Sequence, residues 1–296
     1  MNFFYGLTPF AHTQRNPLFQ SEISRAHWGG SARALVSYTW RSLASICVGL
    51  ILIWLPLSGS TALSVDFTAL LFVTSLIAAP LLDYVCMSAA VSSVSDEIST
   101  GRWTLMRLTS LSDSQIVAAK HGIAQIRTWR LTNLIVALRA AVALMALLTF
   151  VEALYRVRPI DLIAAIDIVF LAMGYGWMAV ILALIYVMEP YWRMRALTAL
   201  GVAISSRVRQ SGLAVVVASF VVVLFWLAQA LISVLYIFEL VSLLPPLIQL
   251  DPTRDQTSLW SLLLFLGVLI PVIYGFYALL QAWCLRHAEA WIAQVR

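Results

Sequence analysis

The sequence predicts an all-α integral membrane protein, and three observations support that prediction. Hydrophobic residues make up 61% of the 296-residue chain and charged residues only 11%, a balance typical of multi-span membrane proteins. Six apolar stretches are long enough to cross the hydrocarbon core, which needs about 20 helical residues. Basic residues are distributed unequally between the two sets of connecting segments, as the positive-inside rule describes.

The N-terminal segment 1–35 lacks a basic start followed by a long apolar core, so we expect no cleaved signal. Pro17 suits the first turn of a helix. Residues 16–28 then place apolar side chains on one helical face: Leu18, Phe19, Ile23 and Ala26. The pattern predicts a helix at the membrane interface leading into the first span, and a disordered tail is the alternative.

The six predicted spans are 36–57, 64–91, 131–155, 162–188, 212–234 and 259–285. An even number of spans places both termini on one side. Of the nineteen Lys and Arg residues, the opposite side holds only Arg156, Arg158 and Arg254, while Arg41 and Arg139 lie inside spans. The other fourteen share the side of the termini, which predicts that both termini are cytoplasmic in a cytoplasmic (inner) membrane protein.

Two charges lie at comparable depths in neighbouring spans: Asp83 in the second and Arg139 in the third. Charges inside a bilayer are costly and usually face a partner or water. The spacing predicts a structural ion pair between these two residues, and a role in a substrate or gating path is the alternative.

Three other charges lie close to the ends of the spans. Arg41 is expected to extend its guanidinium to the lipid headgroups. Glu152 and Asp167 lie beside the outer link and are expected to pair with Arg156 or Arg158.

The longest mostly polar passage, 95–120, connects the second and third spans on the cytoplasmic side. Gly101 can turn the chain at the end of a helix. Apolar residues then recur among polar ones and predict a short docking helix. Ser112 and Gln115 have the spacing of a capping box, so a new helix is expected to begin near Asp113.

Residues 189–211 repeat apolar side chains at intervals of three and four between flanking arginines. This pattern predicts a second cytoplasmic interfacial helix, which rests on anionic lipid or contacts a partner.

The apolar run 212–250 covers about 39 residues, too many for one crossing and too few for two with a loop. Glu239 and the Pro245-Pro246 pair indicate a bend. We therefore expect 235–258 to form an outer re-entrant segment and the link to the last span.

No catalytic or nucleotide-binding motif occurs in the sequence: it has no P-loop, H-E-x-x-H, C-x-x-C or G-x-S-x-G. The three cysteines have no paired spacing, and the four histidines lie on cytoplasmic segments. We expect no catalytic residue, metal or cofactor in this chain. The net charge of +5 follows from the membrane charge bias, so a nucleic-acid partner is not expected.

In 95–120 an acid, Glu97, and Gly101 are followed by an apolar short helix, a Thr-Ser-Leu-Ser turn, and a helix with Ile116 and Lys120. This order resembles the cytoplasmic loop of type-2 ABC transporter permeases, with its coupling helix and Ile-x-x-x-Lys helix start. Asn16-Pro17 with Glu22 is similar to the N-terminal elbow of that family, and ALGVAISSRVRQSGLA to its Leu-Gly-x-x-x-Ser stretch. The chain departs from the family pattern at Ser99, Arg102 and Ser110.

The resemblance implies a permease subunit that moves a substrate across the membrane, while ATP and Mg²⁺ bind a separate ATPase subunit. It also implies a second permease copy or paralogue, and contact with membrane lipids. The residues it assigns to the ATPase interface are Glu97, Gly101, Arg102, Trp103, Leu105, Arg107, Leu108 and Lys120, with Trp103 and Leu105 as anchors.

Two other functions remain open. One is a non-transporting membrane anchor that tethers a cytoplasmic or redox complex through the same face. The other, an enzyme acting on lipids, is less favoured because the loops contain no cluster of His, Asp or Glu.

Overall fold

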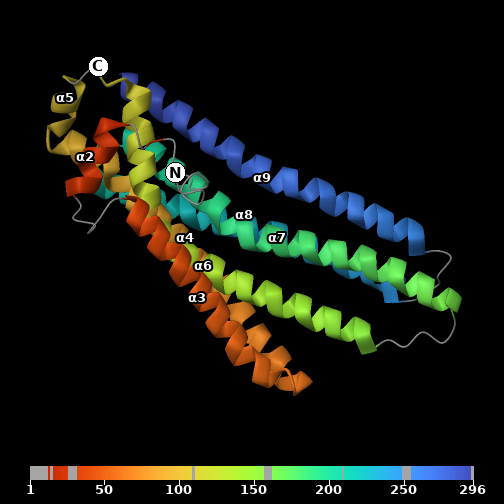
Figure 1. Cartoon of the computed structure of the whole chain (residues 1–296). Coiled ribbons are helices and arrows are strands. Elements are labelled where there is room, and N and C mark those ends of the chain that lie inside the picture. Colours follow the sequence, from red (N-terminus) through yellow and green to blue (C-terminus); the bar gives the residue numbers. More distant parts are fainter. Residues whose placement is uncertain are drawn as a thin grey trace.

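The computed structural model describes residues 13, 16–25, 32–108, 111–156, 162–208, 210–248 and 255–294. The secondary structure in these ranges is helical, with no strand, which confirms the predicted all-α class (Figure 1). Within them, six long helices are accompanied by two short helices at one end. In chain order the helices are α2 (Pro17–Arg25), α3 (Ala32–Leu57), α4 (Thr61–Ser99), α5 (Arg102–Arg107), α6 (Asp113–Arg156), α7 (Leu162–Arg207), α8 (Ser211–Ile248) and α9 (Asp255–Gln294).

Four helical segments within the described part of the chain are long and apolar enough to cross a membrane. They are Trp40–Leu57, Leu63–Ser99, Asp113–Glu152 and Ser211–Leu231. Three of them expose many apolar side chains, which suits contact with lipid, whereas Asp113–Glu152 is more deeply buried within the protein. The side chains of 153–172 and 232–267 lie outside the described residues, so the predicted fourth and sixth spans stay predictions.

The long helices gather at the end of the molecule where α2 and α5 lie and spread apart toward the other end (Figure 1). Helix α7 is central: it packs against α9, α4 and α6, while α3 packs on α6 and α8 on α4. The core lies where these helices meet, and its largest fully buried side chains include Leu82, Trp129, Met194 and Leu197.

The segment 189–207 differs from the prediction of a helix lying on the membrane surface. It is the continuation of α7, and most of it is buried within the protein. Small residues allow this burial, because they let neighbouring helices approach closely. A Cβ atom added at Gly201 would lie only 2.6 Å from the Cβ of Ala90 and 3.2 Å from the Met87 carbonyl oxygen of α4.

The predicted re-entrant segment is also absent from the described backbone, where α8 runs unbroken from Ser211 to Ile248. Glu239 does not by itself end a helix, and Pro245 and Pro246 stand in the last turn, where the helix is already ending. Residues 249–254 of the predicted segment lie outside the described residues.

Candidate functional site

The first part of the site is the end of the molecule where α2, α5 and the ends of the long helices meet. Helix α2 is attached there through Asn16, whose Oδ1 accepts a hydrogen bond from the Leu18 amide at 3.0 Å. The Asn16 Nδ2 donates to the Gln115 carbonyl of α6 at 2.6 Å. Pro17 begins the helix, and Phe19 is buried against α6. The structure therefore shows a helix over Pro17–Arg25 within the predicted 16–28, and this helix packs on the protein. Its position at the membrane interface stays a prediction.

Gly122 of α6 allows the close approach of α2. A Cβ atom at this position would lie 2.7 Å from Thr13 Oγ1 and 2.9 Å from Phe19 Cε2. A larger residue would therefore push α2 away from α6.

The turn between α4 and α5 uses Gly101 in the left-handed region, with φ of +71°, a conformation that glycine adopts without steric cost. Helix α5 follows at Arg102–Arg107 and confirms the predicted short helix. The indole of Trp103 is only 4% exposed and packs into a core formed by α4, α6, α7 and α9. Trp103 therefore anchors α5 to its own chain, and in this structure it is not available to anchor a partner.

The start of α6 confirms the predicted capping box. The amide of Gln115 donates to Ser112 Oγ at 3.3 Å, and the Ser112 amide donates to Gln115 Oε1 at 3.1 Å. Reciprocal bonds of this kind satisfy two backbone donors at a helix start. Helix α6 begins at Asp113, as the sequence predicts.

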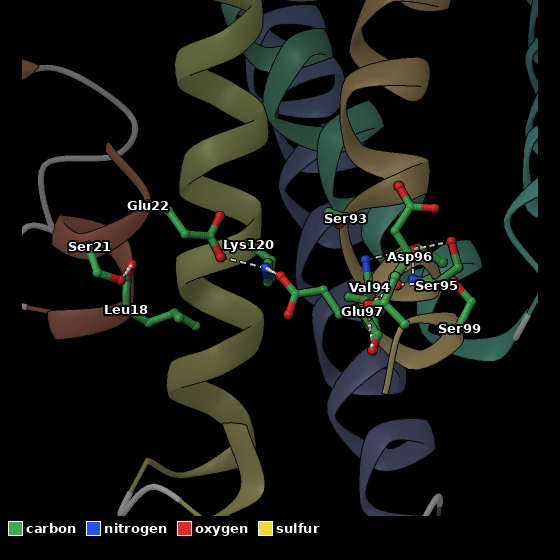
Figure 2. Close-up of polar contacts among 12 residues, drawn as sticks. Leu18, Ser21, Glu22, Ser93, Val94, Ser95, Asp96, Glu97, Ser99 and Lys120 are labelled. Atoms are coloured by element: carbon green, nitrogen blue, oxygen red, sulfur yellow. Dashed lines mark hydrogen bonds and ion pairs between the residues drawn. The ribbon is translucent and has the colours of Figure 1, made fainter. Parts of the chain in front are cut away.

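Lys120 joins three helices at the centre of this end (Figure 2). Its ammonium lies between the carboxylates of Glu22 on α2 and Glu97 on α4, and forms an ion pair with each. The Lys120 side chain is 3% exposed, whereas those of Glu22 and Glu97 are 17% and 22% exposed. The lysine charge is thus compensated inside the protein, while both acids remain partly hydrated.

Helix α7 is tied to α4 by a side chain that bonds to the α4 backbone. The Ser205 hydroxyl accepts hydrogen bonds from the amides of Val94 and Ser95 at 3.0 and 2.9 Å. Val94, Ser95 and Ser205 are all buried. This contact fixes the last turns of α4 relative to α7 just before the Gly101 turn.

Among the described side chains of α5 and its following turn, Arg102 is exposed and Leu108 is 83% exposed. The side chains of Leu105 and Arg107 lie outside the described residues. Of the predicted interface residues, Arg102 and Leu108 are therefore accessible, whereas Trp103 and Lys120 are buried.

The second part of the site is a buried charge network between the long helices. Glu189 Oε2 receives Arg139 Nη1 at 2.7 Å, and Glu189 Oε1 lies 2.6 Å from Arg193 Nε. Arg193 Nη1 lies 3.3 Å from Asp83 Oδ2, and Asp83 is fully buried. Asp83 therefore pairs with Arg193, and the predicted pair between Asp83 and Arg139 does not form, since Glu189 takes the Arg139 guanidinium.

Two aromatic donors extend this network to two more helices. Trp226 of α8 donates its indole N–H to Asp83 Oδ2 at 2.9 Å, and Tyr277 of α9 donates its hydroxyl to Glu189 Oε1 at 2.9 Å. Two acids and two guanidinium groups balance one another, and the network contacts α4, α6, α7, α8 and α9. Such an arrangement holds helices in register, because a buried charge without its partner is costly.

Sequence reasoning missed Glu189 and Arg193 as network members because the apolar window of the fourth span ends at Met188. The available signal was their i, i+4 spacing, which places both side chains on the same face of a helix.

Two of the other predicted intramembrane charges have described side chains. Arg41 is exposed on α3, and Glu152 is partly buried on α6. The contact of Arg41 with lipid headgroups stays a prediction. The side chains of Asp167 and Glu239 lie outside the described residues, as does the link 157–161.

Among the described residues there is no group of three or more His, Cys, Asp or Glu side chains that could hold a metal ion. No family model matches the chain, and neither a curated protein nor a solved structure matches it.

Proposed function

We propose that the chain is the permease subunit of an ATP-driven exporter in a cytoplasmic membrane, with six spans and both termini cytoplasmic. The observation that supports this most is α5, a short helix fixed at both ends between two long helices and followed by the highly exposed Leu108. The sequence has no P-loop, so the ATP would bind a partner that docks on this surface.

The way α5 is attached would allow a movement of such a partner to be transmitted to the long helices. At its N-terminal end the Gly101 turn joins α5 to α4, and beyond its C-terminal end the Ser112 capping box forms the start of α6. Trp103 holds α5 in the core between them. A displacement of α5 would therefore move α4 and α6 together, because interiors are close-packed and transmit strain.

The exposed apolar faces of the long helices suit two further partners. Lipid tails would cover most of them, and a second permease copy or a paralogue would cover the rest and complete a transport path. ATP and Mg²⁺ would be bound by the ATPase subunits.

One observation favours the alternative of a non-transporting membrane anchor. With Trp103 buried in its own chain, the described outward side chains of α5 and its turn include only one large apolar group, Leu108. A surface with so few apolar side chains would also suit the tethering of a cytoplasmic or redox complex.

The experiment that separates the two functions is purification of the protein in mild detergent with its bound subunits. We expect a P-loop ATPase to co-purify with the wild type, and to be lost from Leu108→Glu and Arg102→Glu variants. Arg286→Glu, a charge reversal at an exposed residue on the face of α9 opposite Cys284 and Ala288, serves as the control and should retain it. Recovery of a partner without a nucleotide site would favour the anchor function and contradict the transporter.

A further inference from the structure

A cleft between α7 and α9 adjoins the buried charge network, with which it shares Tyr277. Its lining residues are Trp192, Arg195, Tyr274, Tyr277, Ala278 and Gln281. The two α7 residues are three apart, and the four α9 residues follow i, i+3, i+4, i+7, so each set forms one stripe on its helix. The cleft is thus built by facing stripes of two packed helices and does not depend on a loop.

Among the described residues that line this cleft, Arg195 is the only charged one. Its Nε atom is buried, and no described residue accepts a hydrogen bond from it or forms an ion pair with its guanidinium. Arg193, two residues earlier, is by contrast compensated by Asp83 and Glu189. A partly buried guanidinium without an acid favours an anion from outside the chain, because the desolvated charge otherwise lacks compensation.

The neighbouring side chains suit the neutral and apolar parts of such a ligand. Tyr274 and Trp192 stack edge to face with centroids 5.6 Å apart, and Tyr274 is 47% exposed. Amphipathic aromatic rings of this kind concentrate at membrane interfaces.

We propose that this cleft binds a phosphate group, with the guanidinium of Arg195 as its main ligand and the Gln281 amide as a second donor. Arginine presents planar paired donors that match phosphate oxygens, and basic pockets between membrane helices on the cytoplasmic side bind anionic headgroups. The Tyr277 hydroxyl is engaged by Glu189 and takes no part. The phosphate belongs either to a phospholipid headgroup or to a soluble anion. This site does not depend on the proposed transport function.

The test is native mass spectrometry of the detergent-solubilised protein titrated with phosphatidylglycerol, and with phosphatidylcholine of the same chain length. We expect phosphatidylglycerol to bind the wild type more tightly than phosphatidylcholine. Arg195→Gln should weaken phosphatidylglycerol binding by about tenfold, the effect of losing one charge-assisted contact. Arg286→Gln removes an exposed arginine of α9 outside the cleft and should bind like the wild type.

Inorganic phosphate added as a competitor identifies the source of the group. Displacement of the lipid at similar concentrations indicates a soluble anion, and retention of the lipid indicates a headgroup. Gln281→Leu and Arg195→Lys keep the positive charge, so they test the cleft even where Arg195→Gln fails to fold, and both should bind phosphatidylglycerol more weakly than the wild type. Equal binding of phosphatidylglycerol and phosphatidylcholine, or unchanged binding in all three cleft variants, would overturn the proposal.

Discussion

Lys120 attaches both α2 and α4 to α6 through its two ion pairs. Removing its charge leaves Glu22 and Glu97 facing each other without a cation, and an unpaired buried charge costs more than the pair contributes. Because both acids are partly exposed, we expect a smaller loss than for a fully buried pair. Lys120→Met should lower the free energy of unfolding by about 2 kcal/mol.

The measurement for Lys120 is reversible unfolding in detergent. The double variant Lys120→Met with Glu97→Gln is the matched control, since it removes one of the two carboxylates left unpaired. We expect it to be more stable than Lys120→Met alone. If the second substitution lowers the free energy of unfolding further, the ion pairs of Lys120 are not the source of its stabilising effect.

Within the charge network, the geometry predicts which residues are coupled energetically. Asp83 contacts Arg193 directly, whereas Arg139 contacts Glu189. A double-mutant cycle of Asp83→Asn with Arg193→Gln should give a coupling energy of about 1–3 kcal/mol. The cycle of Asp83→Asn with Arg139→Gln should give a smaller value, measured in the same unfolding assay. A larger coupling energy in the second cycle would support the pair between Asp83 and Arg139 that the sequence predicts.

At the scale of single elements, the close contact of α7 with α4 depends on Gly201. An added methyl group would meet Ala90 and the α4 backbone, neither of which can move aside cheaply. Gly201→Ala should destabilise the protein by about 1–3 kcal/mol, the usual cost of overpacking.

Gly212 at the start of α8 provides the control for Gly201, because nothing lies within 4 Å of an added Cβ there. Gly212→Ala should be neutral or slightly stabilising, since alanine has the higher helix propensity. Thermal unfolding in detergent compares the two variants, and equal stability of both would contradict the close approach of α7 to α4.

The elements also show which features could be predicted from sequence. The Gly101 turn, the short α5 helix and the start of α6 at Asp113 depend on local signals within a few residues, and the structure confirms them. The burial of 189–207 depends on its packing against α4, α6 and α9. A pattern within the segment itself cannot predict which helices pack on it. Its arginines suggested a lipid-facing helix, yet Arg193 is compensated by the distant Asp83.

In the candidate site, too, features that depend on neighbouring residues could be predicted, and features that depend on distant residues could not. A local signal predicted the capping box, and the family resemblance assigned Arg102 and Leu108 to an interface. The ion pair of Lys120 with Glu22, by contrast, connects residues 98 positions apart in the chain. Apolar periodicity indicated that Trp103 faces apolar surroundings. It could not say whether these belong to a partner or to the chain itself, and the structure shows that they belong to the chain.

At the scale of the whole molecule, the predicted topology places α5 in the cytoplasm and the turn between α3 and α4 outside. Single cysteines at Leu108 and Gly59, in a variant without Cys47, Cys86 and Cys284, should therefore react differently with an impermeant maleimide. In intact cells we expect labelling at position 59 only, and labelling at 108 after permeabilisation. The reverse labelling pattern would show the opposite orientation in the membrane, with α5 outside the cell and out of reach of a cytoplasmic ATPase.

The central claim is that the surface of α5 and Leu108 docks an ATP-hydrolysing subunit. It is tested most directly by a photo-cross-linking amino acid at position 108 in the membrane-embedded protein, followed by identification of the cross-linked polypeptide. We predict a covalent adduct with a subunit that contains a P-loop, and its loss when Arg102→Glu is introduced. An adduct only with a polypeptide that has no nucleotide site would contradict the claim.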